Sequence, residues 1–272
     1  MNNSMISAMV SMSGIQQRLD LLADNIANIN TTGYKRKEAS FEDTLTRVKE
    51  QTSKMNLEGR ATPSGFNLGF GSRMTSISNN FIQGSIKETG NPTDLAIEGN
   101  ALFAVLTESG KAYTRAGDFH IQPDPADEES AYLVTGSGHF VLNTDGDPIS
   151  FPAGAKLQID GQGNVLAVTG EEVTEAGRIQ LRTPIRPDAL QQVDGNLFVL
   201  ADGAIEDEVV ADTSLFPQEQ QAQIRQGALE GSNVSLTEEM AEMIQVQRAY
   251  QLAARALTSS ETMAGLANNL RG

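Results

Sequence analysis

The chain has 272 residues, a formal net charge of −15 at pH 7, 39% hydrophobic residues, two histidines and no cysteine. The missing cysteine excludes disulfides, thiol nucleophiles and thiolate metal sites, and two histidines are too few for a histidine-rich metal centre. The acidic balance disfavours nucleic acid and anionic membranes, because both repel negative charge. No apolar run approaches the ~18 residues of a membrane helix, so we expect no membrane insertion. The first residues also lack the pattern of a cleaved signal peptide.

The beginning of the chain has the pattern of one long helix over residues 4–29. Its apolar residues alternate between spacings of three and four, which is the seam of a coiled coil. The residues of this seam are Met5, Ala8, Met12, Ile15, Leu19, Leu22, Ile26 and Ile29. Helical spacing resumes over residues 34–49 after an Asn-, Thr- and Gly-rich stop, so residues 1–45 are predicted to form an N-terminal helical segment.

Residues 46–80 show no sustained helical period and are predicted to form an extended arm. A proline-glycine turn is followed by apolar residues that alternate with asparagine and glycine. The arm residues singled out in this way are Pro63, Gly65, Phe66, Leu68 and Phe70. Exposed apolar alternation is normally covered by something, so we expect the arm to contact a neighbouring subunit. The alternative is a plain surface loop.

Residues 81–212 have the pattern of an all-β domain, a sandwich or a partly open barrel. Short apolar or alternating runs recur between turns, and Asp-Gly pairs such as Asp145-Gly146 and Asp160-Gly161 are strong hairpin signals. Most of the negative charge lies here, since residues 123–212 contain 17 acidic and 4 basic side chains. A Gln-rich connector is predicted over residues 213–234.

The end of the chain, residues 235–272, is predicted to be a second seam-forming helix. Its seam residues are Leu236, Met240, Met243, Tyr250, Ala254 and Leu257, followed in a shifted frame by Met263, Leu266 and Leu270. The predicted fold class is therefore α+β, with an all-β central domain inserted between two coiled-coil-forming helices. A chain whose two ends need helical partners is typical of an assembling subunit.

No pattern in the chain indicates catalysis, a cofactor or a metal. Asn143, Asp145 and Asp147 resemble the start of a calcium loop, but Pro148 stands where the tight-turn glycine belongs and no glutamate follows at the twelfth position. A plain hairpin turn is the expectation there. His120 and His139 lie in strand-like runs, and we expect each to be a surface or satisfied strand residue and not a general base. We therefore expect a protein that is not an enzyme.

Four separated motifs resemble those of the bacterial flagellar rod and hook axial proteins. The first runs from Asn25 to Arg36 and contains Asn25, Asn28, Asn30, Thr31, Thr32, Gly33 and Tyr34. The central motifs are residues 89–99 and 113–119, and the C-terminal signature covers residues 226–234 and 238–250. Because these motifs occur in the family's order and span the chain, the resemblance is specific.

The resemblance implies a structural subunit of the flagellar rod. Within the family the likeness is greatest to the distal rod proteins, because residues 46–80 supply the extended segment typical of them, and Lys35-Arg36-Lys37-Glu38 is similar to the paired rod proteins of Gram-positive bacteria. The implied partners are identical subunits, other rod and hook axial proteins and the flagellar export apparatus. The implied location is the extracytoplasmic basal body, reached without a cleaved signal peptide.

Two other interpretations stay open at this point. A proximal rod or hook-related subunit would carry the same terminal motifs. A soluble β-rich hydrolase or carbohydrate-binding module would keep its activity when both ends of the chain are deleted, whereas an axial subunit would lose its function.

Overall fold

The computed structural model describes residues 2–43, 72–124, 127, 129–170, 172–193, 196–201, 203–217 and 221–269. The chain divides into two compact units. The first, which we call the helical unit, comprises Met1–Ala27, Lys37–Ser78 and Ser235–Gly272. The second, the β unit, comprises Asn28–Arg36 and Asn79–Val234. The two ends of the chain thus meet in one unit, although more than 200 residues separate them in the sequence.

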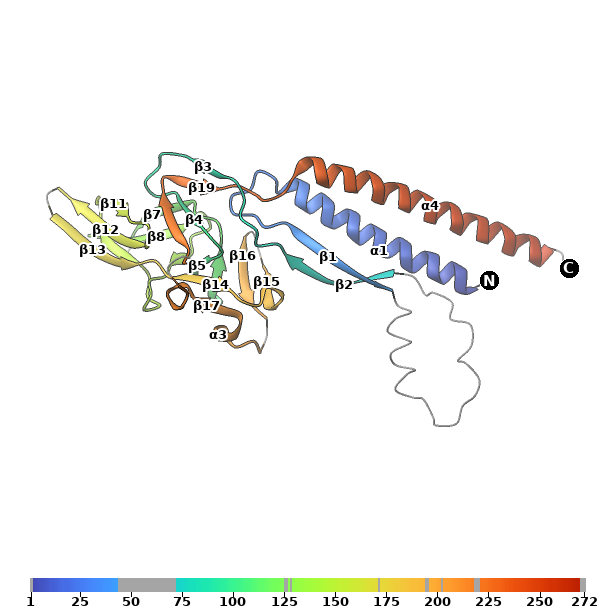
Figure 1. Ribbon diagram of the computed structural model, residues 1–272, viewed down its shortest axis with the longest axis horizontal. Helices are drawn as coiled ribbons and strands as arrows, with labels where there is room; N and C mark the ends of the chain where they lie inside the picture. Colours follow the sequence, from blue (N-terminus) through green and yellow to red (C-terminus); the bar gives the residue numbers. More distant parts are fainter. Residues whose placement is uncertain are drawn as a thin grey trace, which may run out of the picture. The chain divides into compact units, whose positions relative to one another are not determined.

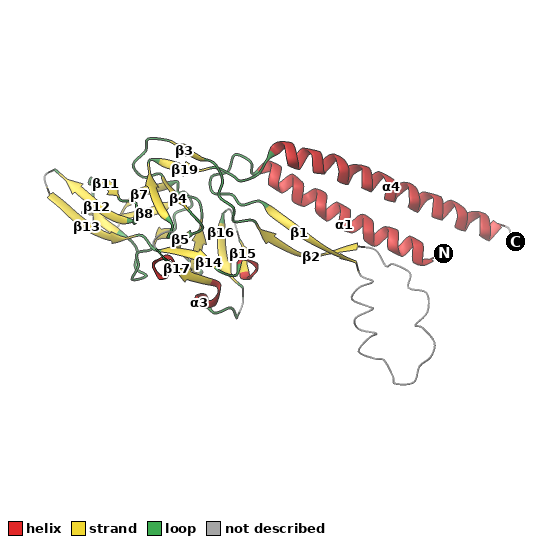
Figure 2. Cartoon of the chain, viewed as in Figure 1, coloured by secondary structure: helices red, strands yellow, loops and turns green. Residues whose placement is uncertain are grey.

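The helical unit is built on two long helices, α1 (Asn2–Ala27) and α4 (Leu236–Asn269). They pack against each other and run antiparallel (Figures 1 and 2). A two-stranded sheet of β1 (Lys37–Asp43) and β2 (Ser72–Asn79) completes the unit, and β1 also contacts α1. Among the described residues, no helix combines the length and the apolarity needed to cross a membrane.

Strand β1 corrects one prediction from the sequence. The helix expected over residues 34–49 is wrong for Lys37–Asp43, which form a strand. Side chains from Lys37 to Ser40 alternate between half-buried and exposed, which is the period of a strand. Pairing with β2, which lies far along the sequence, stabilises this strand: Thr75 Oγ1 donates to the carbonyl oxygen of Ser40 at 3.1 Å. The apolar residues of this segment are few and widely spaced, so the sequence did not distinguish the helical period of 3.6 residues from the strand period of two.

The β unit contains four sheets among its described residues. The largest has ten strands, with the order β10-β8-β9-β5-β6-β16-β15, and with β14, β17 and β7 attached to its sides. Its strands are β5 (Leu102–Thr107), β6 (Gly110–Thr114), β7 (Phe119–Pro123), β8 (Ser130–Thr135), β9 (Phe140–Val141), β10 (Ser150–Pro152), β14 (Leu181–Pro184), β15 (Leu190–Gln192), β16 (Leu197–Leu200) and β17 (Val210–Asp212). The path has two ends, so the sheet is not a closed barrel.

Three smaller sheets complete the unit. One is the antiparallel sheet β11 (Lys156–Ile159), β12 (Asn164–Thr169) and β13 (Glu172–Arg178). The other two pair β18 (Gln223–Gln226) with β4 (Leu95–Glu98), and β19 (Ala228–Glu230) with β3 (Ile86–Glu88). Three short helices, η1 (Pro187–Ala189), α3 (Glu206–Val209) and η2 (Thr213–Leu215), lie in the connections.

Strand β5 separates two apolar clusters. Phe103 and Val105 belong to a cluster that also contains Phe119. Leu102 and Ala104, from the opposite face of the same strand, belong to a second cluster. Side chains of a strand point alternately to its two faces, so a continuous apolar run is what a strand buried on both faces requires.

The structure assigns strands to part of the predicted connector. Within residues 213–234, β18 and β19 pair with the first strands of the β unit, and Ala222, Ile224 and Ala228 are buried. The predicted arm, residues 46–80, overlaps β2 at its end, and its earlier part lies outside the described residues. The α+β class is confirmed, with helices at both ends of the chain and strands between them.

Candidate functional site

The centre of the β unit is a buried ionic cluster around the carboxylate of Glu230. Its Oε1 accepts hydrogen bonds from Lys35 Nζ at 2.7 Å and from the backbone N–H of Gly84 at 2.8 Å. Its Oε2 accepts one from Arg115 Nε at 2.5 Å. The side chains of all three ionic residues are only 1% exposed. Each comes from a different one of the sequence motifs, so the fold brings distant motifs to one point.

Backbone carbonyl groups accept further hydrogen bonds from the two cations. The guanidinium group of Arg115 donates to the carbonyl oxygens of Ile97, Gly99 and Ala101. Lys35 Nζ also donates to the carbonyl oxygen of Ile82, at 2.9 Å. A buried ion needs hydrogen-bond partners, and here protein groups accept two bonds from Lys35 Nζ and four from the Arg115 guanidinium group.

Close backbone packing surrounds the cluster and explains two motif glycines. Gly33 has a φ of +68°, and a Cβ at this position would lie 2.4 Å from the backbone nitrogen of Ala116. At Gly117 a Cβ would lie 1.7 Å from the carbonyl oxygen of Leu95. Neither position has room for a side chain, so these glycines allow the motif segments to approach each other.

Burial changes the titration of the cluster. Loss of solvation, together with the nearby positive charge of Arg115, lowers the pKa of Lys35 to about 8, although Glu230 opposes the shift. Burial also lowers the pKa of Arg115, against the opposing effect of Glu230. Two cations share one carboxylate, so the cluster carries one positive charge more than it can neutralise.

The N-terminal motif divides between the two units. Asn25 is fully buried in the helical unit, where its Nδ2 donates to the carbonyl oxygen of Lys37 at 3.0 Å and to Glu239 Oε2 at 3.3 Å. Its Oδ1 accepts from the backbone N–H of Lys37 at 3.0 Å. The side chain therefore holds α1 to β1 and to α4 at one point.

The rest of that motif lies in the β unit. Thr31 Oγ1 donates to Asn28 Oδ1 at 3.1 Å in a turn, and Asn30 is exposed. Thr31 and Thr32 line a cavity of about 380 Å³ together with the central motif. Its other lining residues include Thr114, Asp118, His139 and Asn196. Tyr34 is buried beside Gly33, so the motif mainly supports packing.

The two long helices contact each other through a polar and an apolar part. Arg18 Nε donates to Glu242 Oε1 at 2.9 Å, close to the Asn25–Glu239 contact. Of the predicted seam residues, Leu22 is buried, and Met12, Ile15, Leu19, Ile26, Ile29, Met243, Tyr250 and Leu257 are half-buried. The side chain of Met5 lies outside those described. Met240 is 53% exposed, whereas Val246, which was not predicted, is 6% exposed.

The predicted arm residues Pro63, Gly65, Phe66, Leu68 and Phe70 all lie outside the described residues. The structure therefore brings the two terminal helices together in the helical unit and, separately, brings three of the sequence motifs together around Glu230 in the β unit. The arm stays a prediction from the sequence.

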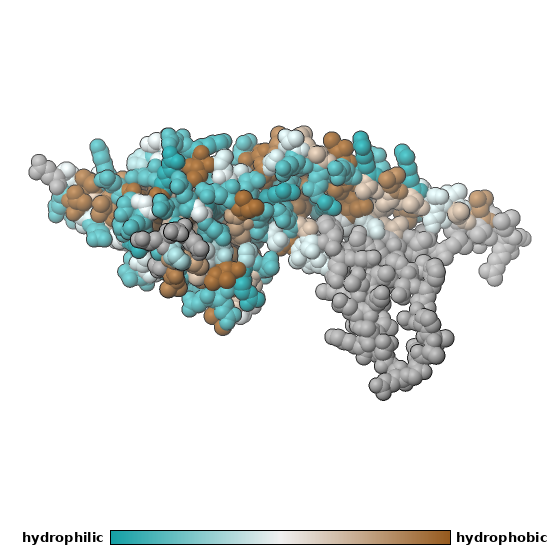
Figure 3. All heavy atoms as spheres, in the orientation of Figure 1, coloured by the Kyte–Doolittle hydropathy of each residue, from teal (hydrophilic) through white to brown (hydrophobic). Residues whose placement is uncertain are grey.

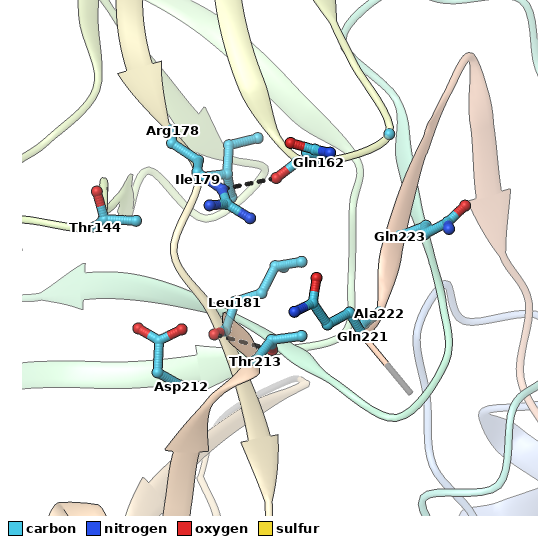
Figure 4. Close-up of a pocket in the computed structure, with 11 residues that line it drawn as sticks. Thr144, Gln162, Arg178, Ile179, Leu181, Asp212, Thr213, Gln221, Ala222 and Gln223 are labelled. Carbon is cyan, nitrogen blue, oxygen red and sulfur yellow. Dashed lines mark hydrogen bonds between the residues drawn. The ribbon is translucent and has the colours of Figure 1, made fainter. Parts of the chain in front are cut away.

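A second cavity in the β unit, of about 530 Å³, has a mixed lining of polar residues and of apolar residues such as Ile179 and Leu181 (Figure 4). Arg178 Nε donates to the carbonyl oxygen of Gln162 at 2.9 Å, and Thr213 Oγ1 donates to that of Leu181 at 3.2 Å. These polar groups thus serve the local backbone. Among the described residues, no group of three or more His, Cys, Asp or Glu side chains is arranged to hold a metal ion.

Lys35, Arg115 and Glu230 lie within the sequence motifs, but they were not among the predicted site residues. One signal was available, because each charged residue lies within two positions of a glycine: Gly33, Gly117 and Gly231. The same spacing occurs at an exposed charge, Glu98 beside Gly99, so it does not by itself mark a buried ion. Nothing in a single sequence shows that the three charges belong together.

Replacing Glu230 by glutamine should strongly destabilise the β unit. The change leaves two buried cations without a counter-charge, and breaking a buried ion pair typically costs about 3–5 kcal/mol in free energy of unfolding. Urea unfolding followed by near-ultraviolet circular dichroism checks this, since Tyr34 and Tyr113 are buried in this unit. The matched control is Glu88→Gln, which removes an exposed pair with Arg225 and should cost at most about 1 kcal/mol. Equal losses for both variants would contradict the central role of Glu230.

The lowered pKa of Lys35 predicts a specific pH dependence. Between about pH 8 and the usual lysine value of 10.5, the folded chain has released a proton that the unfolded chain keeps. The free energy of unfolding should therefore rise with pH in this window, by at most about 1.4 kcal/mol per pH unit from this group. The same pH series is measured on Lys35→Met and subtracted from that of the wild type. The difference removes the contributions of all other titrating groups and leaves that of Lys35. A difference between wild type and variant that is flat or falls from pH 8 to 10 would contradict the assignment.

Three family profiles match the chain. Residues 7–35 match "Flagella basal body rod protein", residues 96–167 match "Flagellar hook protein FlgE/F/G D1 domain", and residues 225–270 match "Flagellar basal body rod FlgEFG protein C-terminal". Lys35 lies in the first of these matches and Arg115 in the second. Glu230 lies in the third.

Characterised relatives match over nearly the whole chain. The flagellar basal-body rod protein FlgG of Borreliella burgdorferi is 33% identical over 100% of this chain and 99% of its own length. FlgG of Bacillus subtilis is 34% identical over 96% of each chain, and the flagellar hook-basal body complex protein FlhP of Bacillus subtilis is 32% identical over 100% of each. The chain therefore belongs to the flagellar basal-body rod protein family, whose members are structural subunits of the basal body and not enzymes.

Proposed function

We propose that this rod subunit polymerises through its paired terminal helices and transmits torque from the motor to the hook, in the distal part of the rod. The observation that carries the proposal is the helical unit, in which α1 and α4 come from opposite ends of the chain and pack along each other. Membership of the family supports assembly with other rod and hook axial proteins at the flagellar basal body. The partners proposed beyond these are identical subunits and the flagellar export apparatus.

The packing of the helices suits a coiled-coil seam. Half-buried apolar residues at Met243, Tyr250 and Leu257 follow each other at seven-residue spacing. At one end of the row, buried polar contacts between Asn25 and Glu239 replace apolar packing. A polar residue in an apolar seam costs stability but fixes the register of the two helices.

The ionic cluster suits a subunit under mechanical load. Lys35 comes just before β1, and Glu230 comes shortly before α4. Force that enters the β unit through either chain segment therefore meets a residue that is bonded to the cluster. Charge-assisted hydrogen bonds of this kind are about twice as strong as neutral ones, and the side chains that make them are only 1% exposed to solvent.

The distal position is proposed from the sequence between β1 and β2. Residues 46–80 are similar to the extended segment of distal rod proteins, and several relatives carry the name FlgG. A proximal rod or hook-related subunit is the second candidate. It is favoured by a 32% identity to the flagellar basal-body rod protein FlgF of Caulobacter vibrioides over 96% of this chain. Export without a cleaved signal peptide belongs to the same proposal.

The helix contact should be essential for swimming. Val246→Asp places a charge in the buried face of α4, and an unpaired buried charge costs several kcal/mol. In a strain lacking the native gene, this variant should fail to restore motility on soft agar, while near-ultraviolet circular dichroism shows a folded β unit. Gln247→Asp is the matched control, because residue 247 is exposed and should restore swimming. Normal swimming with Val246→Asp would contradict assembly through this helix pair.

The arm should stiffen the distal rod. Deleting residues 50–64 should give rods in isolated basal bodies that are short, unstable or abnormally flexible when imaged by electron microscopy. A Gly-Ser segment of equal length should fail in the same way, because the contacts and not the length matter. A surface loop would tolerate both changes, since the entropy of loop closure varies slowly with length. Straight, full-length rods in either strain would contradict the arm and favour the second candidate.

A further inference from the structure

Arg178, which lines the cavity of about 530 Å³, has more hydrogen-bonding capacity than the chain uses. It is the last residue of β13, and its Nε donates to the carbonyl oxygen of Gln162 at 2.9 Å. This bond holds one edge of the planar guanidinium group. In the part of the chain that the structure describes, its two Nη atoms make no hydrogen bond, and no carboxylate oxygen lies within 4.0 Å of them. The cavity thus contains a guanidinium group that is held in place but has no counter-ion.

A cation without a counter-ion is unexpected in this part of the sequence. Residues 123–212 contain 17 acidic and 4 basic side chains, and most of the visible surface of the β unit is hydrophilic (Figure 3). Another cation of the same region does pair, since Arg186 Nη1 lies 3.7 Å from Glu208 Oε2. Carboxylates are therefore plentiful where Arg178 has none. The terminal nitrogens of Arg178 are available to an anion from outside the chain.

The other charge in the lining restricts what this anion can be. Arg178 and Asp212 lie on opposite sides of the cavity, and Leu181 lies between them (Figure 4). The carboxylate of Asp212 repels a second negative charge inside the cavity. A ligand with one carboxylate fits this arrangement better than a phosphate does, and a positive group at its far end would add attraction.

A fixed amide group on a third side of the cavity adds a hydrogen-bond acceptor. Gln221 Nε2 donates to the carbonyl oxygen of Phe216 at 2.9 Å, and Gln221 Oε1 points into the cavity (Figure 4). Among the described residues this oxygen accepts no hydrogen bond, so it is open to an N–H donor of a ligand. Leu181 and Ala222 supply apolar lining for a small aliphatic side chain. A carboxylate, an N–H group and an aliphatic side chain occur together at the C-terminal end of a peptide.

We propose that this cavity binds the C-terminal end of a short peptide. The peptide carboxylate accepts two parallel hydrogen bonds from the Nη atoms of Arg178, as forked guanidinium groups offer. The last amide N–H of the peptide donates to Gln221 Oε1, and its aliphatic side chain contacts Leu181. Its ammonium group lies on the side of Asp212. The volume of about 530 Å³ is typical of small-ligand sites, and capture of a free carboxylate is a recurring mode of peptide recognition. This site goes beyond the proposed function, because nothing in it depends on assembly of the chain.

Three related peptides test the chemistry of the ligand. The full-length chain is titrated with tri-alanine, with tri-alanine amide and with N-acetyl-tri-alanine, and binding is followed by isothermal titration calorimetry. The amide should bind at least about tenfold more weakly than the acid, because it removes the charge-assisted hydrogen bonds to Arg178. Weaker binding of the acetylated peptide would identify a free short peptide as the ligand. Equal binding of the acetylated peptide would identify the C-terminus of a longer chain.

Variants of two exposed arginines test the location of the site. Arg178→Gln should weaken binding of tri-alanine at least about tenfold, and Arg178→Lys should weaken it less, because it keeps the charge but not the fork. The matched control is Arg186→Gln, which changes an exposed arginine outside this cavity and should leave the affinity unchanged. Near-ultraviolet circular dichroism checks that all three variants keep the fold.

Four results would overturn the proposal. They are no binding of any of the three peptides, equal affinity for the acid and the amide, equal losses at positions 178 and 186, and acetate binding as tightly as tri-alanine. The last result would leave a site for any carboxylate and not for a peptide. All four would leave the rod assignment intact, since none of them measures assembly.

Discussion

The carboxylate of Glu230 is the one negative charge between two buried cations, Lys35 and Arg115. The packing of the motif segments in the β unit depends on this arrangement. A carboxylate with two oxygens can satisfy Lys35 and Arg115 only if both approach from fixed directions. The backbone carbonyls of Ile97, Gly99 and Ala101 complete the shell of Arg115. Each partner comes from a distant part of the chain, so the cluster cannot form until those parts have reached their native places. Because a buried ion pair adds little net stability over apolar packing, we infer that the cluster mainly selects the native arrangement of these segments.

In the helical unit, too, buried polar contacts fix how distant segments pack, although they are fewer than in the ionic cluster. Asn25, Glu239 and the backbone of Lys37 meet at one buried point, while the Arg18–Glu242 pair and apolar residues make the rest of the contact between α1 and α4. The polar point makes other registers of the two helices unfavourable, since any shift would leave buried groups without their partners. A subunit that has to join others in a defined order gains from such a fixed pairing of its own helices.

The sequence predicted the elements well where local periodicity is strong. The long terminal helices were recognised from their apolar spacing, and strands such as Leu102–Thr107 from their apolar runs. Strand β1 was missed because its pairing with β2 is a long-range contact that local spacing does not reveal. The phase of α4 was only partly predicted. Apolar residues lie on two sides of this helix, one side containing Met240 and the other Met243. The side of Met243 is the buried one, since Val246 and Glu239 on that side are buried, whereas Met240 is exposed. The ionic cluster was hidden for the same reason, since three charges from distant motifs meet only in the folded chain.

The central strand β5 has a further mechanical consequence. Its two faces supply side chains to both apolar clusters, through Phe103 on one side and Leu102 on the other. A disturbance on either face moves the shared backbone, and close-packed interiors transmit such strain with little compression. The two clusters are thus coupled elastically and should yield together, as one cooperative body. For the torque transmission that we propose, such a body is advantageous, because partial melting of one cluster would dissipate the transmitted work.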